Sequence, residues 1–320
     1  MRIGYPCINR SIGCKGNRKF RLSSHSEERL IGTIQNNLDC LFEMLRYNSS
    51  QRILFFRITS DLIPFASHPI CQFNWQSYFK DKFRSVGDFI KGHAMRISMH
   101  PGQFTLINAE NPTVFENSRQ ELLYHAEVLD LMELDTAAKI QLHVGGIYGD
   151  KSKSKARFIE RYCELDEVIK RRLIIENDDQ NYHLADCLEI SQNTGIPVLF
   201  DAFHHDVFSS GETIGDALEL VEHSWKEQDG IPMLDYSTQQ PAAAKGKHAE
   251  AIDLAHFKHF LEETRPFDFD VMLEIKDKEK SALKAVHVLQ KDPRFTKHEP
   301  EENSEDDPPG ANPDPQSQTY

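Results

Sequence analysis

The chain alternates eight times between a short apolar run and a longer amphipathic stretch, and this alternation limits its fold more than any other feature. The expected strands are residues 2–8, 52–59, 94–99, 139–144, 173–176, 196–200, 232–236 and 270–275. The expected helices are residues 26–46, 76–91, 115–134, 153–170, 183–193, 213–226, 249–264 and 278–290. Eight strand–helix units predict an α/β fold, a (β/α)8 TIM barrel in one domain over residues 1–290.

Residues at the expected helix ends support this pattern. Ser26, Asn117 and Ser281 stand where helix starts are expected, and Gly195 follows an expected helix end. A doubly wound open sheet is the alternative, but it normally has a glycine-rich phosphate-binding turn after its first strand. Residues 8–13 read Ile-Asn-Arg-Ser-Ile-Gly and do not form such a turn, so the barrel is favoured.

The last residues, 291–320, have a different composition from the rest of the chain. Six prolines stand there among acids and serines, which predicts a disordered acidic tail. The net charge of −13 at first argues against a nucleic-acid partner. Seven of the acids lie within residues 299–320, however, and without them the charge is −6. The overall charge therefore decides nothing about the partner.

The sequence shows neither a membrane segment nor a secretion signal. Its longest apolar runs, such as residues 53–56 and 196–200, are far shorter than the roughly 20 residues of a bilayer helix. The six cysteines form no paired motif and are expected to be reduced and isolated, as in an intracellular protein. We therefore expect a monomer without a membrane partner, cytoplasmic in a prokaryote and nuclear in a eukaryote.

Histidines and acids stand at or shortly after the ends of the expected strands, where a TIM barrel places its active site. They are His68, His100, His143, Glu176, Asp201, His204, Asp235, His248 and Glu274. Buried carboxylates without compensation would cost several kcal/mol each, and histidine with carboxylate is a ligand set for Zn²⁺ or Mn²⁺. The pattern predicts two or three divalent ions rather than a hydrogen-bonded polar core.

Three of the loops on the same side of the expected barrel are basic. Their cations are Arg10, Lys15, Arg18, Lys19 and Arg21; Lys151, Lys153, Lys155 and Arg157; and Lys245, Lys247 and His248. A cationic rim around a metal centre suits a polyanion with a scissile phosphodiester, that is, a nucleic acid. Tyr5, Gln103, Phe104 and Tyr148 are also available there to stack on or replace an unpaired base.

Several strings, taken together, resemble the UV damage endonuclease family. They are Gly4-Tyr5 with Asn9-Arg10, residues 57–64 with 67–69, 96–103, 143–146 with 149–151, 176–179, and 200–205. The resemblance covers residues 1–290. It implies a TIM barrel related to the endonuclease IV type of abasic-site nuclease. It also implies incision of double-stranded DNA immediately 5′ to pyrimidine dimers and 6-4 photoproducts. It also implies Mn²⁺ as the cofactor, with Zn²⁺ or Mg²⁺ as alternatives, and abasic sites as substrates of some members.

The resemblance also implies roles for individual residues. The implied metal ligands are His68, His100, His143, Glu176, Asp201, His204, His248 and Glu274, and among these we expect Glu176, His143, Asp201 and Glu274 to serve catalysis. Tyr5, Gln103 and Phe104 match positions that probe the lesion, and Asn9, Arg10, Tyr148 and Lys151 are further candidates for DNA contact. Some members have Lys and His on the seventh strand, where this chain has Met233 and Asp235. A carboxylated lysine is thus not expected, and Asp235 is expected to replace the histidine as a ligand.

Two other functions stay open at this point. A sugar isomerase or epimerase on the same metal barrel would explain the histidines and acids but not the three basic loops. A non-catalytic binder of damaged DNA would need the lesion-probing residues but not a full set of metal ligands.

Overall fold

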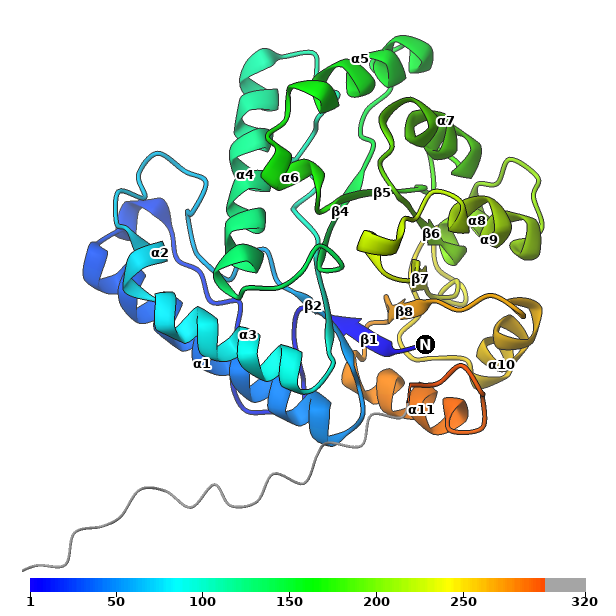
Figure 1. The fold of residues 1–320 in the computed structure, drawn as a ribbon, viewed down its shortest axis with the longest axis horizontal. Helices are drawn as coiled ribbons and strands as arrows, with labels where there is room; N and C mark the ends of the chain where they lie inside the picture. Colours follow the sequence, from blue (N-terminus) through cyan, green and yellow to red (C-terminus); the bar gives the residue numbers. More distant parts are fainter. Residues whose placement is uncertain (297–320) are drawn as a thin grey trace, which may run out of the picture.

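The computed structural model describes residues 1–296, which form a closed barrel of eight parallel strands (Figure 1). The strands are β1 (Ile3–Pro6), β2 (Phe55–Ile58), β3 (Arg96–Met99), β4 (Lys139–His143), β5 (Leu173–Glu176), β6 (Val198–Asp201), β7 (Met233–Tyr236) and β8 (Asp270–Leu273). Each strand pairs with the next along the chain, and β8 closes the barrel on β1 through Ile3–Val271 and Gly4–Met272. The predicted (β/α)8 fold is confirmed.

Helices surround the strands. They are α1 (Glu27–Ser50), α2 (Trp75–Tyr78), α3 (Lys80–Gly92), α4 (Pro112–Leu131), α5 (Lys151–Glu164), α6 (Glu167–Lys170), α7 (Leu184–Thr194), α8 (Ala202–Val207), α9 (Ile214–Glu222), α10 (Leu254–Glu263) and α11 (Glu279–Leu289), with 3-10 turns at Leu22–Ser24 and Glu227–Asp229. Two expected helices, residues 76–91 and 153–170, are each divided in two, and α8 was not predicted. Within residues 1–296, no helix is both long and apolar enough to span a bilayer.

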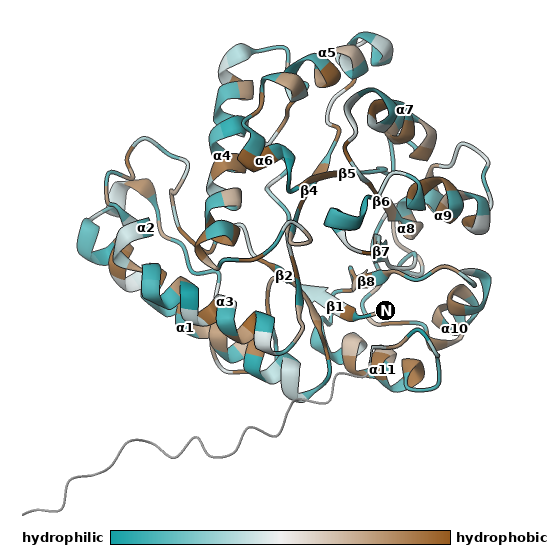
Figure 2. Cartoon of the chain, in the orientation of Figure 1, coloured by the Kyte–Doolittle hydropathy of each residue, from teal (hydrophilic) through white to brown (hydrophobic). Residues whose placement is uncertain are grey.

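The helices are amphipathic, and their apolar residues form the core against the outside of the barrel. In α1, for example, the buried residues Leu30, Ile34, Leu38, Leu41 and Leu45 recur at intervals of three and four, which places them on one helix face. Figure 2 shows the resulting mixture of brown and teal along each helix around largely brown strands. The strands are buried on both faces, which explains why they appear in the sequence as continuous apolar runs.

Two of the side-chain layers inside the barrel lie closest to the carboxyl ends of the strands. The lower layer is an apolar cluster of Phe55, Ile174, Leu199, Met233 and Met272. Two positions later in the same five segments stand Arg57, Glu176, Asp201, Asp235 and Glu274. Because side chains along a strand alternate between faces, both sets point into the barrel, and the charged set lies nearer the carboxyl ends. The apolar layer is therefore the floor of the charged one.

Two of the predicted helix caps are confirmed and two are wrong. Ser26 caps α1 by accepting a hydrogen bond from the Arg29 amide, and Gly195 ends α7 with φ of 76°, a conformation that favours glycine. Helix α4 begins six residues earlier than a cap at Asn117 would require, because Asn111 supplies the cap and Pro112 the first helical residue. Ser281 lies inside α11, where its hydroxyl accepts from the Ile252 amide.

The first residues of the predicted disordered tail are ordered on the barrel, which corrects that prediction. Residues 291–296 contact the bottom of the barrel, and Phe295 is buried there. The ammonium of Met1 donates to the Arg294 carbonyl over 2.5 Å, and the Thr296 amide donates to the carbonyl of Met1. The remainder of the predicted tail, residues 297–320, lies outside the described residues.

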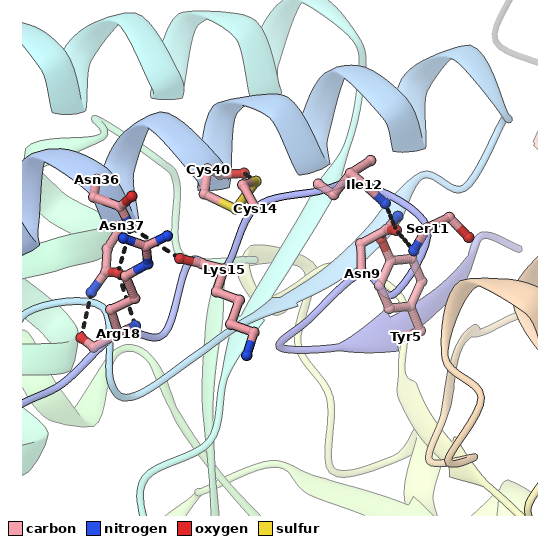
Figure 3. Close-up of a disulfide and its surroundings, with 10 residues drawn as sticks. All are labelled: Tyr5, Asn9, Ser11, Ile12, Cys14, Lys15, Arg18, Asn36, Asn37 and Cys40. Carbon is pink, nitrogen blue, oxygen red and sulfur yellow. Dashed lines mark hydrogen bonds between the residues drawn. A yellow bond between two sulfur atoms is a disulfide. The ribbon is translucent and has the colours of Figure 1, made fainter.

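The loop between β1 and α1 is attached to α1 by a disulfide, so the prediction of six isolated, reduced cysteines is wrong for two of them. Cys14 in the loop and Cys40 on α1 are joined, with their Cα atoms 5.7 Å apart (Figure 3). One turn of α1 before Cys40, the side chain of Asn37 accepts a hydrogen bond from the Arg18 amide and donates one to the Arg18 carbonyl. The basic loop 10–21 is thus fixed to α1 by covalent and polar contacts.

Candidate active site

The carboxyl ends of the strands surround a cavity of about 820 Å³. Its floor carries Arg57, His143 and Glu274 from the barrel interior. Its walls come from the segments after β3, β4, β5, β6 and β7, and include His100, Gln103, Gly145, Asp178, His204 and His248. The opening lies on the face where TIM-barrel enzymes carry their active sites. The sequence placed the site on this face.

A first group of metal-binding atoms joins β3, β4 and β5. His100, His143 and Glu176 each offer a ligand atom, and these atoms lie within 4.8 Å of one another. Nε2 of His143 is 2.8 Å from Oε1 of Glu176, and Nε2 of His100 is 3.7 Å from the same oxygen. Nδ1 of His100 donates to the Pro101 carbonyl, which leaves Nε2 free to act as a ligand.

A second group consists of three carboxylates, Asp201, Asp235 and Glu274, again with ligand atoms within 4.8 Å of one another. Next to it, Nδ1 of His204 donates to the Asn177 carbonyl over 3.0 Å, and Nδ1 of His248 donates to the Glu274 carbonyl over 2.9 Å. Both rings therefore have Nε2 available. Such hydrogen bonds on the second ring nitrogen are usual for histidines that bind metals.

Charged neighbours change the proton affinity of this cluster. Burial would raise the pKa of Glu176, but His143 and His100 hold it well below its usual range. Burial would likewise lower the pKa of His143, but Glu176 raises it to about 9. Burial raises the pKa of Asp201 to about 6 against the opposite effect of His204. Shifts of this size are frequent at functional sites.

The donor atoms fit divalent ions. Among the described residues, the buried Oε2 of Glu176 has no hydrogen-bond partner, although an unpartnered buried carboxylate oxygen is costly. A cation between the two groups would supply that partner and would offset the concentrated negative charge. Imidazole nitrogens with carboxylate oxygens are ligands of Mn²⁺ and Zn²⁺. The candidate ligand groups thus support metal binding, and the identity of the metal stays a prediction.

Comparison with known proteins identifies the family. The family model described as UV-endonuclease UvdE matches residues 2–300. The chain belongs to the UV-endonuclease family. A UV DNA damage endonuclease of Clostridium perfringens is 40% identical over 291 residues, which cover 90% of this chain and 71% of the relative. The prediction that the chain belongs to this family is confirmed, and so is the prediction that it is an endonuclease.

Solved structures agree with the family and with the fold. The crystal structure of SacUVDE superposes with a TM-score of 0.87 at 47% identity, over 91% of this chain and 98% of that chain. A D-psicose 3-epimerase from Clostridium cellulolyticum has a TM-score of 0.53 at 10% identity, over 78% of this chain and 92% of its own. The second likeness shows a shared barrel fold alone.

One residue that the family resemblance implied as a ligand is not near the others in this structure. His68 is exposed in the loop after β2, where its Nδ1 accepts from the Ile70 amide over 3.1 Å. Within residues 1–296 it belongs neither to the two ligand groups nor to the cavity lining. The other eight predicted ligands either form these groups or stand beside them.

The predicted lesion-probing residues fall into two sets. Gln103 and Phe104 are exposed beside the cavity, with Phe104 at 68% exposure, and Tyr148 is exposed on the loop after β4. Tyr5 instead is fully buried, and its hydroxyl donates to Asn48 and accepts from the side chain of Asn9. The prediction that Tyr5 and Asn9 contact DNA is therefore corrected. Both residues have a structural role beneath the loop that follows β1.

The basic rim holds fewer free cations than its sequence suggests. Lys151 and Lys155 both pair with Asp186 on α7, and Lys155 also pairs with Glu189. The side chain of Lys153 is 81% exposed and pairs only with Asp150, whose side chain is itself 44% exposed, over 3.3 Å. Arg10, Lys245 and Lys247 are exposed as well. Lys151 is thus mainly a structural cation, and Lys153 and the loops after β1 and β7 supply the accessible positive charge.

Three polar residues of the site had no predicted role. Arg57 and Gln141 point into the barrel from β2 and β4 and bind each other, with 2.5 Å between Nη2 and Oε1. Asn177 bridges β5 and β6 by donating to the Asp201 carbonyl and accepting from the Asp201 amide. The signal in the sequence was a charged or amide residue within or directly after an otherwise apolar strand.

Proposed function

We propose that this protein is a metal-dependent DNA repair endonuclease that nicks duplex DNA immediately 5′ to UV photoproducts, with abasic sites as further substrates. The observation that carries the proposal is the pair of ligand groups at the base of the cavity, where four histidines and four carboxylates converge on the barrel end. Family membership supports an endonuclease, and the names of the relatives indicate UV-damaged DNA as the substrate.

The proposed cofactor is two or three divalent ions, with Mn²⁺ favoured by the mixed histidine and carboxylate ligands. His100, His143 and Glu176 would hold one ion, and His204, His248, Asp201 and Glu274 would hold its neighbour, with Glu176 between them. When bound, such ions polarise a phosphodiester and lower the pKa of water. The residues of the chain hold the donor atoms in place through Asn177, Pro101 and the Glu274 carbonyl.

The residues around the cavity would position the damaged strand. A photodimer stacks poorly, so extruding it from the duplex costs less than extruding normal bases. Phe104 presents an exposed ring, and Gln103 beside it offers both donors and an acceptor to unpaired bases. Gly102 allows this arrangement because a Cβ at that position would lie 2.5 Å from the ring of Phe104. The turn thus holds the aromatic ring at the rim of the cavity.

An incision assay tests the proposal. Purified protein freed of metal by a chelator is incubated with UV-irradiated and with intact duplex of the same sequence, with and without Mn²⁺. We expect nicking of the irradiated duplex only when Mn²⁺ is present, with the 3′ end of the product directly before the dimer.

The alternatives give other results in the same assay. Binding of irradiated DNA without any nick would indicate a damage binder. Neither binding nor nicking, with epimerisation of a ketose in the presence of Mn²⁺, would indicate a sugar epimerase. Equal incision after removal of all divalent ions would refute the metal dependence.

A further inference from the structure

Arg57 lies inside the barrel, at the centre of the charged layer. Its side chain is 2% exposed, and its Nη2 donates to both oxygens of Asp235, at 2.7 and 2.9 Å. Its Nη1 donates to Oε1 of Glu274. A guanidinium stays protonated in proteins, and here two carboxylates accept its hydrogen bonds. A permanent cation therefore stands within the carboxylate group of Asp201, Asp235 and Glu274.

Asp235 already has its hydrogen-bonding capacity largely occupied. Besides Arg57, the side-chain amide of Gln141 donates to Oδ2 of Asp235 over 2.7 Å. The carboxylate is fully buried, so water does not compete for it. Charge-assisted contacts of this kind are among the strongest hydrogen bonds in proteins. Removing Asp235 from Arg57 to bind a metal would leave the guanidinium short of partners in a dry interior.

Hydrogen bonding distinguishes Asp235 from the other buried carboxylates. Glu176, Asp201 and Asp235 are all buried and outside the cavity lining, whereas Arg57 and Glu274 line it. Asp235 stands in the same layer as Arg57, two residues after Met233 of the apolar floor. Both of its oxygens accept from Arg57, and Oδ2 also accepts from Gln141, so these donors compete with a metal ion for Asp235.

The charges of the layer suggest how many ions it holds. Four carboxylates, those of Glu176, Asp201, Asp235 and Glu274, face one another in the two ligand groups. Arg57 offsets one of these charges. Two divalent ions would offset the remaining three and leave a single positive charge, which suits an anionic phosphodiester.

We infer that Arg57 is a positioning residue that serves as a built-in cation, holds Asp235 out of the metal site and limits the centre to two divalent ions. This inference rests on the proposed metal dependence and narrows its count of two or three ions. Asp235 is then the counterion of Arg57, although the sequence suggested that it replaces a histidine ligand.

The number of bound ions tests the inference without reference to activity. Protein stripped with a chelator is equilibrated with Mn²⁺ at pH 8, and bound manganese per chain is measured by elemental analysis after dialysis. We expect two ions in the wild type and two in Asp235→Asn, whose amide oxygen can still accept from Arg57. In Arg57→Met we expect a third ion, because three carboxylates then face one another without a cation.

Arg96→Met is the matched control, since Arg96 is also a buried barrel arginine and pairs with Asp270 at the opposite end. It should bind two ions even if its melting temperature falls. A wild-type count of one or three ions, a lost ion in Asp235→Asn, or an unchanged count in Arg57→Met would overturn the inference while leaving metal-dependent incision intact. A wild type that binds no manganese would refute the proposed function itself. If Arg57→Met does not fold, the wild type and Asp235→Asn still decide between a counterion and a ligand.

Discussion

Nε2 of His143 lies 2.8 Å from Oε1 of Glu176, and the two residues are register partners at the ends of β4 and β5. Parallel pairing thus brings a nitrogen and an oxygen ligand together without help from any loop. The other oxygen of Glu176 is buried and has no partner within residues 1–296. This carboxylate is therefore the group that we expect to be shared between two ions.

Glu176→Gln should lower incision of irradiated DNA by about 100-fold or more, because an amide cannot bridge two cations. Bound manganese should fall as well, whereas the circular dichroism spectrum should stay that of a folded barrel. Both are measured on the purified variant at saturating Mn²⁺. Glu160→Gln, a change of the same kind on the exposed face of α5, is the control and should behave as the wild type. Wild-type turnover by Glu176→Gln would remove this residue from the site.

Gln103→Ala combined with Phe104→Ala should lower discrimination between damaged and intact duplex roughly tenfold, since stacking on one aromatic ring contributes about 1–3 kcal/mol. Binding to the two duplexes is measured by fluorescence anisotropy, beside a melting curve. Bound manganese should not change, because neither residue is a proposed ligand. Leu220→Ala removes another exposed apolar side chain, on α9, and should leave discrimination unaltered. Lost stability with unchanged discrimination would mean that Phe104 only packs on its own turn.

Lys153→Ala should reduce the slope of log K against log salt for DNA binding by about one, because one phosphate contact and its released counterion are lost. Lys155→Ala should leave that slope nearly unchanged, because Asp186 and Glu189 already neutralise this lysine. The two variants and the wild type are compared by titrating labelled duplex with each protein at four salt concentrations. An equal slope for Lys153→Ala and the wild type would show that this lysine faces solvent only.

His125 should make the protein less stable in acid. Burial lowers the pKa of His125 to about 4, and its Nε2 has no partner among the described residues. An unfolded histidine has a pKa of about 6.5, so the unfolded chain takes up a proton first as the pH falls, and stability present above pH 6.5 is lost towards pH 4. Between pH 7 and 4.5 this group should remove about 2 kcal/mol from the free energy of unfolding.

Urea denaturation of the metal-free protein at these two pH values measures that loss. His125→Gln, which cannot titrate, should lose about 2 kcal/mol less than the wild type over the same interval. His223→Gln changes an exposed histidine and should follow the wild-type curve. Parallel losses in all three proteins would contradict the assignment to His125.

The barrel and most of its site could be predicted because both follow from local patterns. Each strand reads as a short apolar run, and Glu176 and Asp201 are the last residues of such runs. Residues at strand ends converge in any parallel barrel, so their order in the chain was enough to place them on one face. Family resemblance added the expectation that the exposed turn at Gln103 probes the lesion.

What could not be predicted depends on partners far apart in the sequence. In the sequence Arg57 is a single charged residue within an apolar strand. Its pairing with Asp235 becomes visible only when the fold brings Gln141 and Asp235 beside it. Lys151 and Lys153 look alike in the sequence, yet only Lys151 meets Asp186. The bond between Cys14 and Cys40 likewise requires the loop after β1 to fold back onto α1.

The burial of the ligand groups gives the stiffness of the duplex a part in the proposed choice of substrate. Glu176 and Asp201 are buried at the ends of β5 and β6, whereas Phe104 is exposed. We expect a backbone phosphate to approach these carboxylates only when the helix bends or opens, and smooth bending of a site costs of the order of 1–6 kcal/mol. Under the proposed function, a defect that softens the helix, such as a dimer or a missing base, would lower this bending cost.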